Sequence, residues 1–323
     1  MTSVQLAQAS NAAVYAAMLT LTLAMILFAV SFAAGRRRPA ATATIVSVES
    51  VESVGGTAVI TRTAETADRS SDPGRRAANI GMSLTWLSFL TLLLGVILRG
   101  VWAGRVPWGN MYEFSITAAL GILGVFLAMS IRRDLRWLGL FVVIPALLTL
   151  GLAVTVLYTE AAQLVPALKS YWLVIHVSAA IICAGAFTFA AATAGLSLVR
   201  SRLERKAGTT EIGGWASRMP TSERLQSLTN RVVAFAFPLW TFAVVAGAIW
   251  AENAWGRYWG WDPKETWAFI TWVIFAAYLH ARSTAGWRGN RSSWIVIIGW
   301  VAFLINYFGV NIFVNSLHSY SGM

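Results

Sequence analysis

The sequence predicts an all-α, polytopic integral membrane protein with about eight transmembrane helices and both termini on the extracytoplasmic side. Hydrophobic residues make up 57% of the chain and charged residues only 12%, a balance that excludes an ordinary soluble domain. A helix needs roughly 20 apolar residues to cross about 30 Å of hydrocarbon. Apolar runs, of which the seventh is the shortest, lie at 12–34, 80–101, 112–131, 137–158, 171–199, 232–250, 267–281 and 294–313.

The first apolar run differs from a signal peptide in its flanking charges. No basic region precedes it, and the basic cluster Arg36–Arg38 follows it. We therefore expect a true membrane span whose N-terminus lies outside.

The basic residues predict the orientation of the chain. Twenty of the 25 Lys and Arg residues fall in alternate loops, at 36–76, 132–136, 200–231 and 282–291. Because Lys and Arg mark cytoplasmic loops, that face is predicted to be cytoplasmic. We expect the membrane to be the plasma membrane. The net charge of +11 is then a topology signal, so the bilayer is an expected partner and nucleic acid is not.

Three parts are predicted along the chain. Residues 1–34 form an N-terminal transmembrane helix, 35–79 a flexible cytoplasmic linker, and 80–323 a transmembrane domain. The linker is rich in Thr, Ser, Ala, Val and Glu without a helical period, which is typical of a flexible segment. A helix start at Thr221 predicts a short surface helix over 221–231.

A tryptophan-rich segment, 250–267, separates the sixth and seventh runs. It is too polar and too broken by Gly and Pro to span a bilayer, and we expect it at the outer surface. Its aromatic side chains form a flat apolar platform that suits a flat apolar ligand, for which haem is the obvious candidate. An ordinary interfacial tryptophan belt is the alternative. The candidate binding residues are Trp255, Trp259, Trp261, Asp262, Trp267 and Arg257.

Two of the three histidines are predicted on the platform's side of the membrane. His176 lies near the start of the fifth run, roughly 8 Å below the outer interface. His318 follows the last run. Two neutral imidazoles can bind an iron atom at its two axial positions, so both are candidate metal ligands. A hydrogen-bonded interfacial histidine is the alternative for either one alone.

His280 lies roughly 20 Å beyond Trp267, towards the cytoplasmic end of the seventh run. No second histidine of this chain reaches that depth. If His280 binds haem iron, its opposite ligand must come from another subunit; a polar residue extending to the interface near Arg282 is the alternative.

Charged residues of the tryptophan-rich segment have two expected roles. Arg257 and Lys264 are placed to pair with haem propionates, or are ordinary interfacial charges. Asp262 and Glu265 lie three residues apart, and we expect a structural role at the N-terminus of the seventh helix rather than a direct part in chemistry.

Four separated motifs resemble one known family. The stretch WGRYWGWDPKETW (255–267) resembles the "WWD" signature of haem-handling membrane proteins, and its WDPKE form resembles the CcsA (ResC) branch of system II cytochrome c biogenesis. PWGNMYE (107–113), LVPALKSYWLVIHV (164–177) and the terminal LHSYSG resemble the same branch, so the similarity extends from about Val101 to the C-terminus.

The resemblance implies a function and a ligand set. It implies that His176 and His318 bind haem b externally, and that His280 belongs to a membrane haem site completed by a CcsB (ResB) partner. The implied reaction is thioether formation between haem vinyl groups and the CxxCH thiols of apocytochrome c. Because these thiols belong to the substrate, the lone buried-type Cys183 is no objection. The sequence leaves open whether this chain is itself an enzyme or one subunit of a holocytochrome c synthase.

Other functions compete with this one. A haem exporter without attachment activity would use the same three histidines. A haem b electron-transfer protein usually needs two histidine pairs, which three histidines do not supply. A membrane scaffold would bind no haem, and the WWD relatives of the system I pathway match the WDPKE form less well.

Overall fold

The computed structural model describes residues 2–34, 73–161, 168–284 and 286–318. These residues form an all-helical structure, as the sequence predicts, with eight long helices that correspond in order to the eight predicted runs. The helices are α1 (Ser3–Ala33), α2 (Pro73–Ala103), α3 (Met111–Arg132), α4 (Gly139–Thr155), α5 (Tyr171–Ala207), α6 (Ser222–Trp255), α7 (Pro263–Ser283) and α8 (Asn290–Leu304). The shorter turns are η2 (Arg136–Leu138), η4 (Gly214–Arg218), the π-helical η5 (Ile305–Gly309) and α9 (Val310–Phe313).

Among the described residues, seven helical segments are long and apolar enough to span a membrane. The long helix α7 is not among them, because its mean hydropathy is too low. Its first turn carries Lys264 and Glu265 and its last turn carries His280 and Arg282, and these polar residues lower the mean hydropathy of its 21 residues. The corresponding sequence run, 267–281, is the shortest of the eight. The eighth span is composite, because η5 and α9 continue α8 to Phe313.

Some helices begin earlier than the sequence predicts. The helix α2 begins at Pro73, so the end of the predicted 35–79 linker is helical; the part at 35–72 lies outside the described residues. The predicted helix start at Thr221 is present, since its side chain accepts from the Arg224 N–H. That helix is not a separate surface helix, however. The buried Leu225, Leu228 and Val232 continue the apolar face directly into the sixth span.

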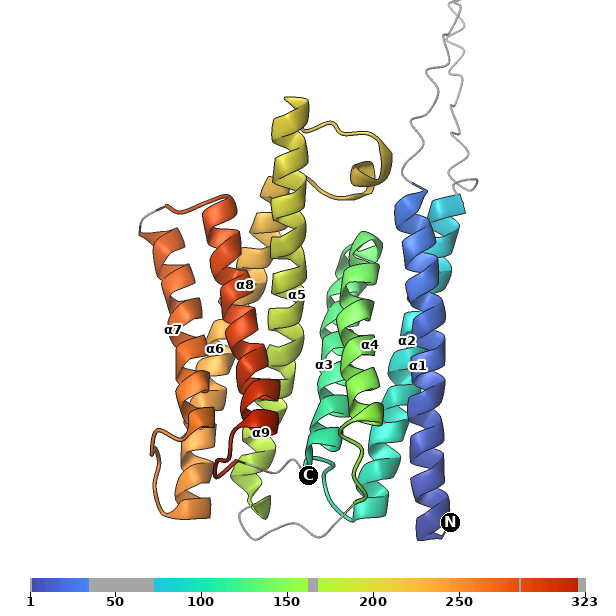
Figure 1. Cartoon of the computed structure of the whole chain (residues 1–323). Helices are drawn as coiled ribbons and strands as arrows, with labels where there is room; N and C mark the ends of the chain where they lie inside the picture. The colour runs from blue at the N-terminus through green and yellow to red at the C-terminus, as the bar shows by residue number, and fades with distance from the viewer. Residues whose placement is uncertain (1, 35–72, 162–167, 285, 319–323) are drawn as a thin grey trace, which may run out of the picture.

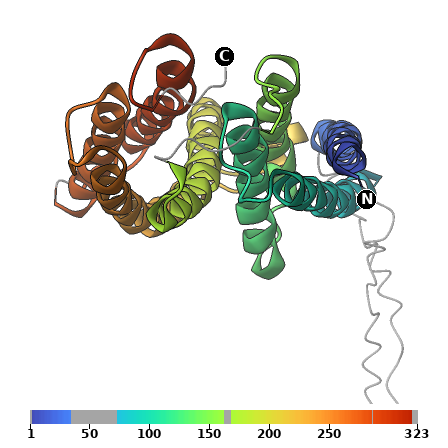
Figure 2. The same ribbon diagram turned by 90° about the horizontal axis from the view of Figure 1, so that it is seen from below.

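The bundle is organised around α5, which packs against α3, α6 and α8 (Figures 1 and 2). The α1–α2 pair lies on one flank, against α4, and the α7–α8 pair lies on the other. The crossing of α3 and α5 depends on glycine. A side chain at Gly185 would overlap the backbone carbonyl of Gly121, so the two helices approach as closely as small residues allow.

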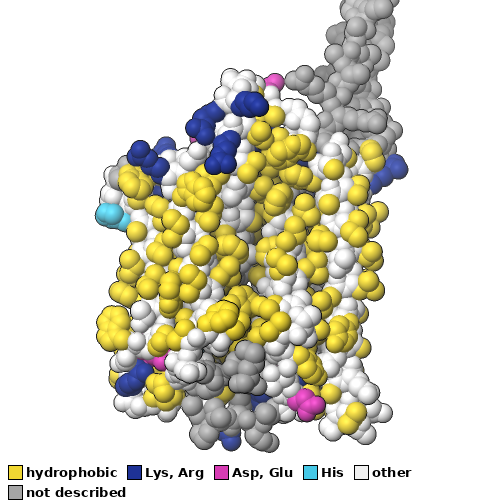
Figure 3. All heavy atoms as spheres, viewed as in Figure 1, with side chains coloured by type: hydrophobic (Ala, Val, Ile, Leu, Met, Phe, Trp, Pro, Cys, Tyr) yellow, Lys and Arg dark blue, Asp and Glu magenta, His cyan; other side chains and the backbone are white. Residues whose placement is uncertain are grey.

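One end of the bundle carries the candidate site. The helices α1, α3, α5 and α7 begin there, and α9 ends there; we call it the platform end (bottom of Figure 1). Hydrophobic side chains cover the middle of the molecule, while Lys and Arg gather mainly at the opposite end (Figure 3). This is the pattern of a protein whose middle faces hydrocarbon.

Candidate functional site

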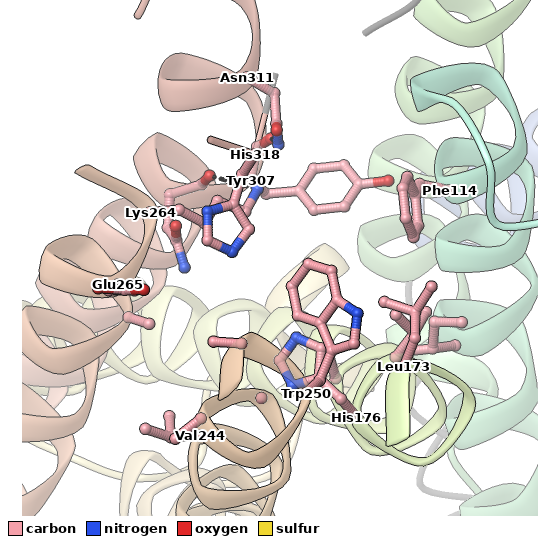
Figure 4. A pocket seen from close by; sticks show the side chains of 18 of the residues that line it. Phe114, Leu173, His176, Val244, Trp250, Lys264, Glu265, Tyr307, Asn311 and His318 are labelled. Carbon is pink, nitrogen blue, oxygen red and sulfur yellow. Dashed lines mark hydrogen bonds between the residues drawn. The ribbon is translucent and has the colours of Figure 1, made fainter. Parts of the chain in front are cut away.

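A large cavity lies at the platform end, between α3, α5, α6, α7 and the η5–α9 segment (Figure 4). It encloses about 1150 Å³, including the part that is open to solvent. The space inside it that water could occupy measures about 150 Å³, which is less than the roughly 300–1,000 Å³ of typical small-molecule and cofactor sites, so a large, flat ligand requires the walls to move. Its walls are mostly apolar, with Met111, Phe114, Leu173, Val244, Phe303 and Tyr307 among the lining residues.

His176 lines the cavity from the second turn of α5. Its Nδ1 lies 2.7 Å from the backbone oxygen of Ala243 on α6. Since a carbonyl oxygen only accepts, Nδ1 carries the hydrogen and donates it. Nε2 therefore keeps its lone pair, which is the state in which a histidine binds a metal.

Gly247 creates the space for this arrangement. A Cβ atom at position 247 would lie 2.7 Å from Nδ1 of His176, which is closer than real Cβ contacts. The ring therefore reaches α6 only because residue 247 has no side chain. The sequence gives no direct sign of this role, because Gly247 lies in an ordinary apolar run.

His318 lines the same cavity from the segment that follows α9. Its Nδ1 lies 2.8 Å from Oδ2 of Asp262, and the Leu317 N–H donates to Oδ1 of the same carboxylate at 3.0 Å. Because the carboxylate accepts, Nδ1 of His318 also carries the hydrogen and Nε2 keeps its lone pair. The two histidines thus share one tautomer, each fixed by an acceptor on Nδ1.

Burial and hydrogen bonds set the protonation of this pair. Burial lowers the pKa of His318 below its ordinary value, and the Asp262 hydrogen bond only partly opposes the shift, so the imidazole is neutral at pH 7. Burial alone would raise the pKa of Asp262. The hydrogen bonds from His318, Leu317 and Lys264 outweigh it and hold that pKa below its ordinary value, so the carboxylate is ionised.

Asp262 and Glu265 build the turn that carries the tryptophans. Asp262 is the N-cap of α7, and Glu265 completes a capping box with it. Oε2 of Glu265 accepts from the N–H groups of Gly260, at 2.8 Å, and Asp262, at 3.1 Å. Trp261, between them, has φ of 59°, which lets both N–H groups converge on one oxygen. These contacts are those of the structural role expected for the two acids.

The predicted aromatic residues divide into two groups. Trp259 lines the cavity, and Trp255 contacts the His318 ring with 4.8 Å between centroids. Trp261 is 66% exposed and packs on Trp259 and Phe269, away from the cavity. Trp267 also lies outside the lining. The structure therefore brings Trp255 and Trp259, but not Trp261 and Trp267, to the histidines.

The two predicted cations also differ. Arg257 does not line the cavity, and its Nη1 pairs with Oε1 of Glu265 at 3.0 Å. Lys264 does line it, and Nζ donates to the backbone oxygen of Asn306 at 3.0 Å. Within the described part of the chain, no carboxylate lies within ion-pair distance of Nζ. Lys264 is thus the cation whose charge is directed at the cavity.

The sequence does not single out several lining residues. Trp250, Asn306, Tyr307 and Asn311 all face the cavity, although the sequence places them inside apolar runs. The available signal is the polar pair Asn306 and Asn311, five residues apart in the last run. That spacing matches one turn of the π-helix at η5, and π-turns concentrate at functional sites.

The PWGNMYE stretch positions the start of α3. Glu113 is fully buried and accepts from Arg99 Nε at 3.0 Å, Arg105 Nη1 at 2.7 Å and the Gly109 N–H at 2.7 Å. Asn110 caps the helix. The motif therefore fixes the first turn of α3, which presents Met111 and Phe114 to the cavity.

His280 lies far from this cavity. It is exposed near the end of α7, at the end of the bundle opposite the platform end, and is not a lining residue. The structure therefore brings together His176 and His318 and separates His280 from both.

The fold and the site define a multi-pass helical membrane protein with a two-histidine cavity near one end. The family model described as "Cytochrome C assembly protein" matches residues 108–318. Cytochrome c biogenesis protein CcsA of Guillardia theta is 36% identical over 256 residues, which cover 75% of this chain and 85% of that protein. CcsA of Prochlorococcus marinus is 38% identical over 261 residues, covering 72% of this chain and 80% of that protein.

The chain therefore belongs to the cytochrome c assembly protein family, in its CcsA branch, which confirms the predicted resemblance. Among solved structures, cytochrome c haem lyase CcmF has a similar fold, with a TM-score of 0.59 at 17% sequence identity. The match covers 95% of this chain and 47% of CcmF, so the chain spans about half the length of that protein.

Proposed function

We propose that this chain is the haem-handling subunit of a system II cytochrome c synthase, and that it holds haem b between His176 and His318 for attachment to apocytochrome c. The observation that carries the proposal is that both imidazoles line one cavity with Nδ1 engaged elsewhere and Nε2 available. In this proposal haem is the substrate, which the protein moves and presents, rather than a resident cofactor.

The composition of the cavity fits haem better than a bare metal ion. Among the described residues, no three His, Cys, Asp or Glu side chains are grouped as a metal site. Two histidines alone would leave most ion coordination positions empty. Haem iron brings its equatorial ligands in the porphyrin and needs only two axial ones. The apolar walls suit the macrocycle, and Lys264 suits a propionate carboxylate.

Attachment needs a thiol from outside this chain. Cys183, its single cysteine, is buried and is not a lining residue. In the proposed reaction the sulfur of each apocytochrome thiol bonds to a vinyl carbon of haem, and the proton goes to the neighbouring vinyl carbon, so no net oxidation occurs. The contribution of this chain is to hold and orient the haem, which lowers the barrier by proximity.

The position of His280 supports a second haem site that is shared with a partner protein. An exposed histidine on a helix flank that faces neither this cavity nor a second histidine suits a ligand completed by another subunit. We assign that subunit to a CcsB (ResB)-like membrane protein. In this scheme haem arrives from the cytoplasmic side at His280 and moves to the platform end, which faces outwards from the plasma membrane.

Two alternatives make different products. A haem exporter would release free haem outside, whereas a synthase subunit yields haem bound covalently to a cytochrome. A haem b electron-transfer protein would need a second internal histidine pair, and His280 has no partner histidine in this chain.

The test is co-expression of this chain with its CcsB-like partner and a reporter apocytochrome that carries one CxxCH motif. Covalent haem is read by haem staining of the denatured reporter. We expect staining with the native chain and its loss with His176→Ala or His318→Ala. Export of free haem with an unstained reporter would support the exporter instead. If His280→Ala stains the reporter as strongly as the native chain, His280 is not the entry site for haem.

A further inference from the structure

Trp250 contacts both candidate ligands at once (Figure 4). Its ring is nearly parallel to that of His176, with 6.3 Å between centroids and 13° between planes. It also meets the His318 ring edge-on, with 5.5 Å between centroids and 65° between planes. The side chain is 2% exposed, so this position is enclosed within the site.

This arrangement is incompatible with a haem bound by both histidines. Axial ligands lie on opposite faces of the porphyrin, so the macrocycle separates the two imidazoles. A side chain that touches both rings would have to pass through the porphyrin plane or reach around its edge. One indole is too small to reach around it, so at least one of the two contacts must break.

We infer that Trp250 closes the site in the haem-free protein and that the porphyrin displaces it. This inference rests on the proposed function, since it requires both histidines to bind one iron. Trp250 is then a positioning residue: it holds the two histidines in a haem-free arrangement, and the porphyrin takes its place between them.

The packing around Trp250 favours such a movement. Trp250, Leu168, Leu173 and Val177 form a small buried cluster that is separate from the main core of the bundle. Small clusters with few buried contacts rearrange at lower cost than a core. Trp255, whose ring centroid lies 4.9 Å from that of Trp250, packs against the same cluster. After displacement the indole can pack on the porphyrin, so part of the lost contact is recovered by stacking.

If haem binds only to open molecules, the observed rate and the apparent affinity of haem binding equal those of the open form multiplied by the fraction of molecules that are open. Minor conformations of proteins are commonly populated at about 0.1–10%. Trp250→Ala removes the obstructing side chain, so we expect haem to associate with this variant about tenfold faster or more.

The first measurement is fluorine NMR of the full chain in nanodiscs, with 5-fluorotryptophan at all 16 tryptophans. The Trp250 resonance is assigned by its loss in Trp250→Phe. Adding gallium protoporphyrin, which is diamagnetic, is expected to shift this resonance strongly in the native chain. In His176→Ala and His318→Ala the shift should be absent or reduced, because bridging by both histidines is what drives the displacement.

The second measurement is stopped-flow haem binding to the haem-free chain. Trp250→Phe, which is more conservative, should fall between the native chain and Trp250→Ala. Trp272→Ala is the matched control, since Trp272 packs on Phe269 and bonds to Thr241 outside the cavity, and it should leave the rate unchanged.

The outcomes are distinct. Haem binding that depends on both histidines, with an unmoved Trp250 resonance and an unchanged Trp250→Ala rate, would overturn the displacement and leave the proposed function intact. Haem binding that ignores both histidines would overturn the proposed function and the displacement together.

Discussion

His318 donates from Nδ1 to Oδ2 of Asp262 across 2.8 Å, and this contact joins the tail after α9 to the first turn of α7. The carboxylate has three tasks at once: it caps α7, it accepts from the Leu317 N–H, and it fixes the His318 tautomer. An acceptor on the distal nitrogen orients a ligand and increases its basicity. His318 lies outside the WWD signature. Asp262, which belongs to the signature, therefore fixes the tautomer of a candidate ligand from another part of the chain.

Asp262→Asn keeps the size of this side chain and removes its charge. Mutation of the hydrogen-bond partner of a metal-binding histidine typically lowers metal affinity about 10–100-fold, and we expect haem affinity to fall by that factor. Haem titration monitored by absorbance gives the value. Glu223→Gln, at the exposed start of α6, is the control that changes charge elsewhere. If Asp262→Asn binds haem as tightly as the control, Asp262 does not position His318 for haem binding.

Gly247→Ala places a methyl group where the His176 ring lies. Overpacking of this kind costs about 1–3 kcal/mol, so we expect the ring to leave Ala243 and haem affinity to fall roughly tenfold. Gly195→Ala is the matched control, because a Cβ there meets nothing within 4 Å. That control should fold as well as the native chain and bind haem equally. Equal binding by Gly247→Ala would show that the ring does not need this space.

Lys264→Gln tests the cation in the cavity. A hydrogen bond to a charged group contributes about 1.5–3 kcal/mol, so loss of a propionate partner should weaken haem binding about 10–100-fold. Haem dimethyl ester lacks the carboxylates and should bind the native chain and Lys264→Gln equally. Arg257→Gln, outside the cavity, is expected to have a smaller effect on both ligands. A Lys264→Gln loss of the same size with the ester would assign Lys264 a role in folding instead.

Glu113→Gln tests the buried network at the start of α3. Removing one partner of a buried ion pair leaves its mate unpaired and costs about 3–5 kcal/mol, in this case affecting the fully buried Arg99. Thermal unfolding in detergent should show a large loss of stability. Asp134→Asn breaks a surface pair, with Asp134 67% exposed, and should cost less than about 1 kcal/mol. Equal melting of the two variants would show that the network does not hold this end of the bundle.

The fold was largely predictable because the bilayer constrains helix length and composition. The eight runs, the shortness of the seventh and the helix start at Thr221 all follow from hydropathy and capping chemistry. The merging of residues 222–231 with the sixth span was missed. It depends on where Leu225 and Leu228 pack, which a single sequence does not show.

The site was predictable only in part. The sequence predicts His176 and His318 on the same side of the membrane as the tryptophan-rich segment, and the structure places both in one cavity. Tryptophan content alone did not distinguish Trp259, which lines the cavity, from the exposed Trp261, because the turn geometry at Gly260–Asp262 decides it. Gly247 and Trp250 act through three-dimensional contact with His176, so they leave no pattern along the chain.

Axial ligation of haem by His176 and His318 is tested most simply by the spin state of haem bound to the purified full chain. We expect a low-spin, six-coordinate haem by optical and electron paramagnetic resonance spectra, and unchanged spectra at the platform site in His280→Ala. His176→Ala and His318→Ala should each give a high-spin haem that added imidazole returns to low spin. A native chain without low-spin haem, or single variants that keep it unchanged, would contradict axial ligation by this pair.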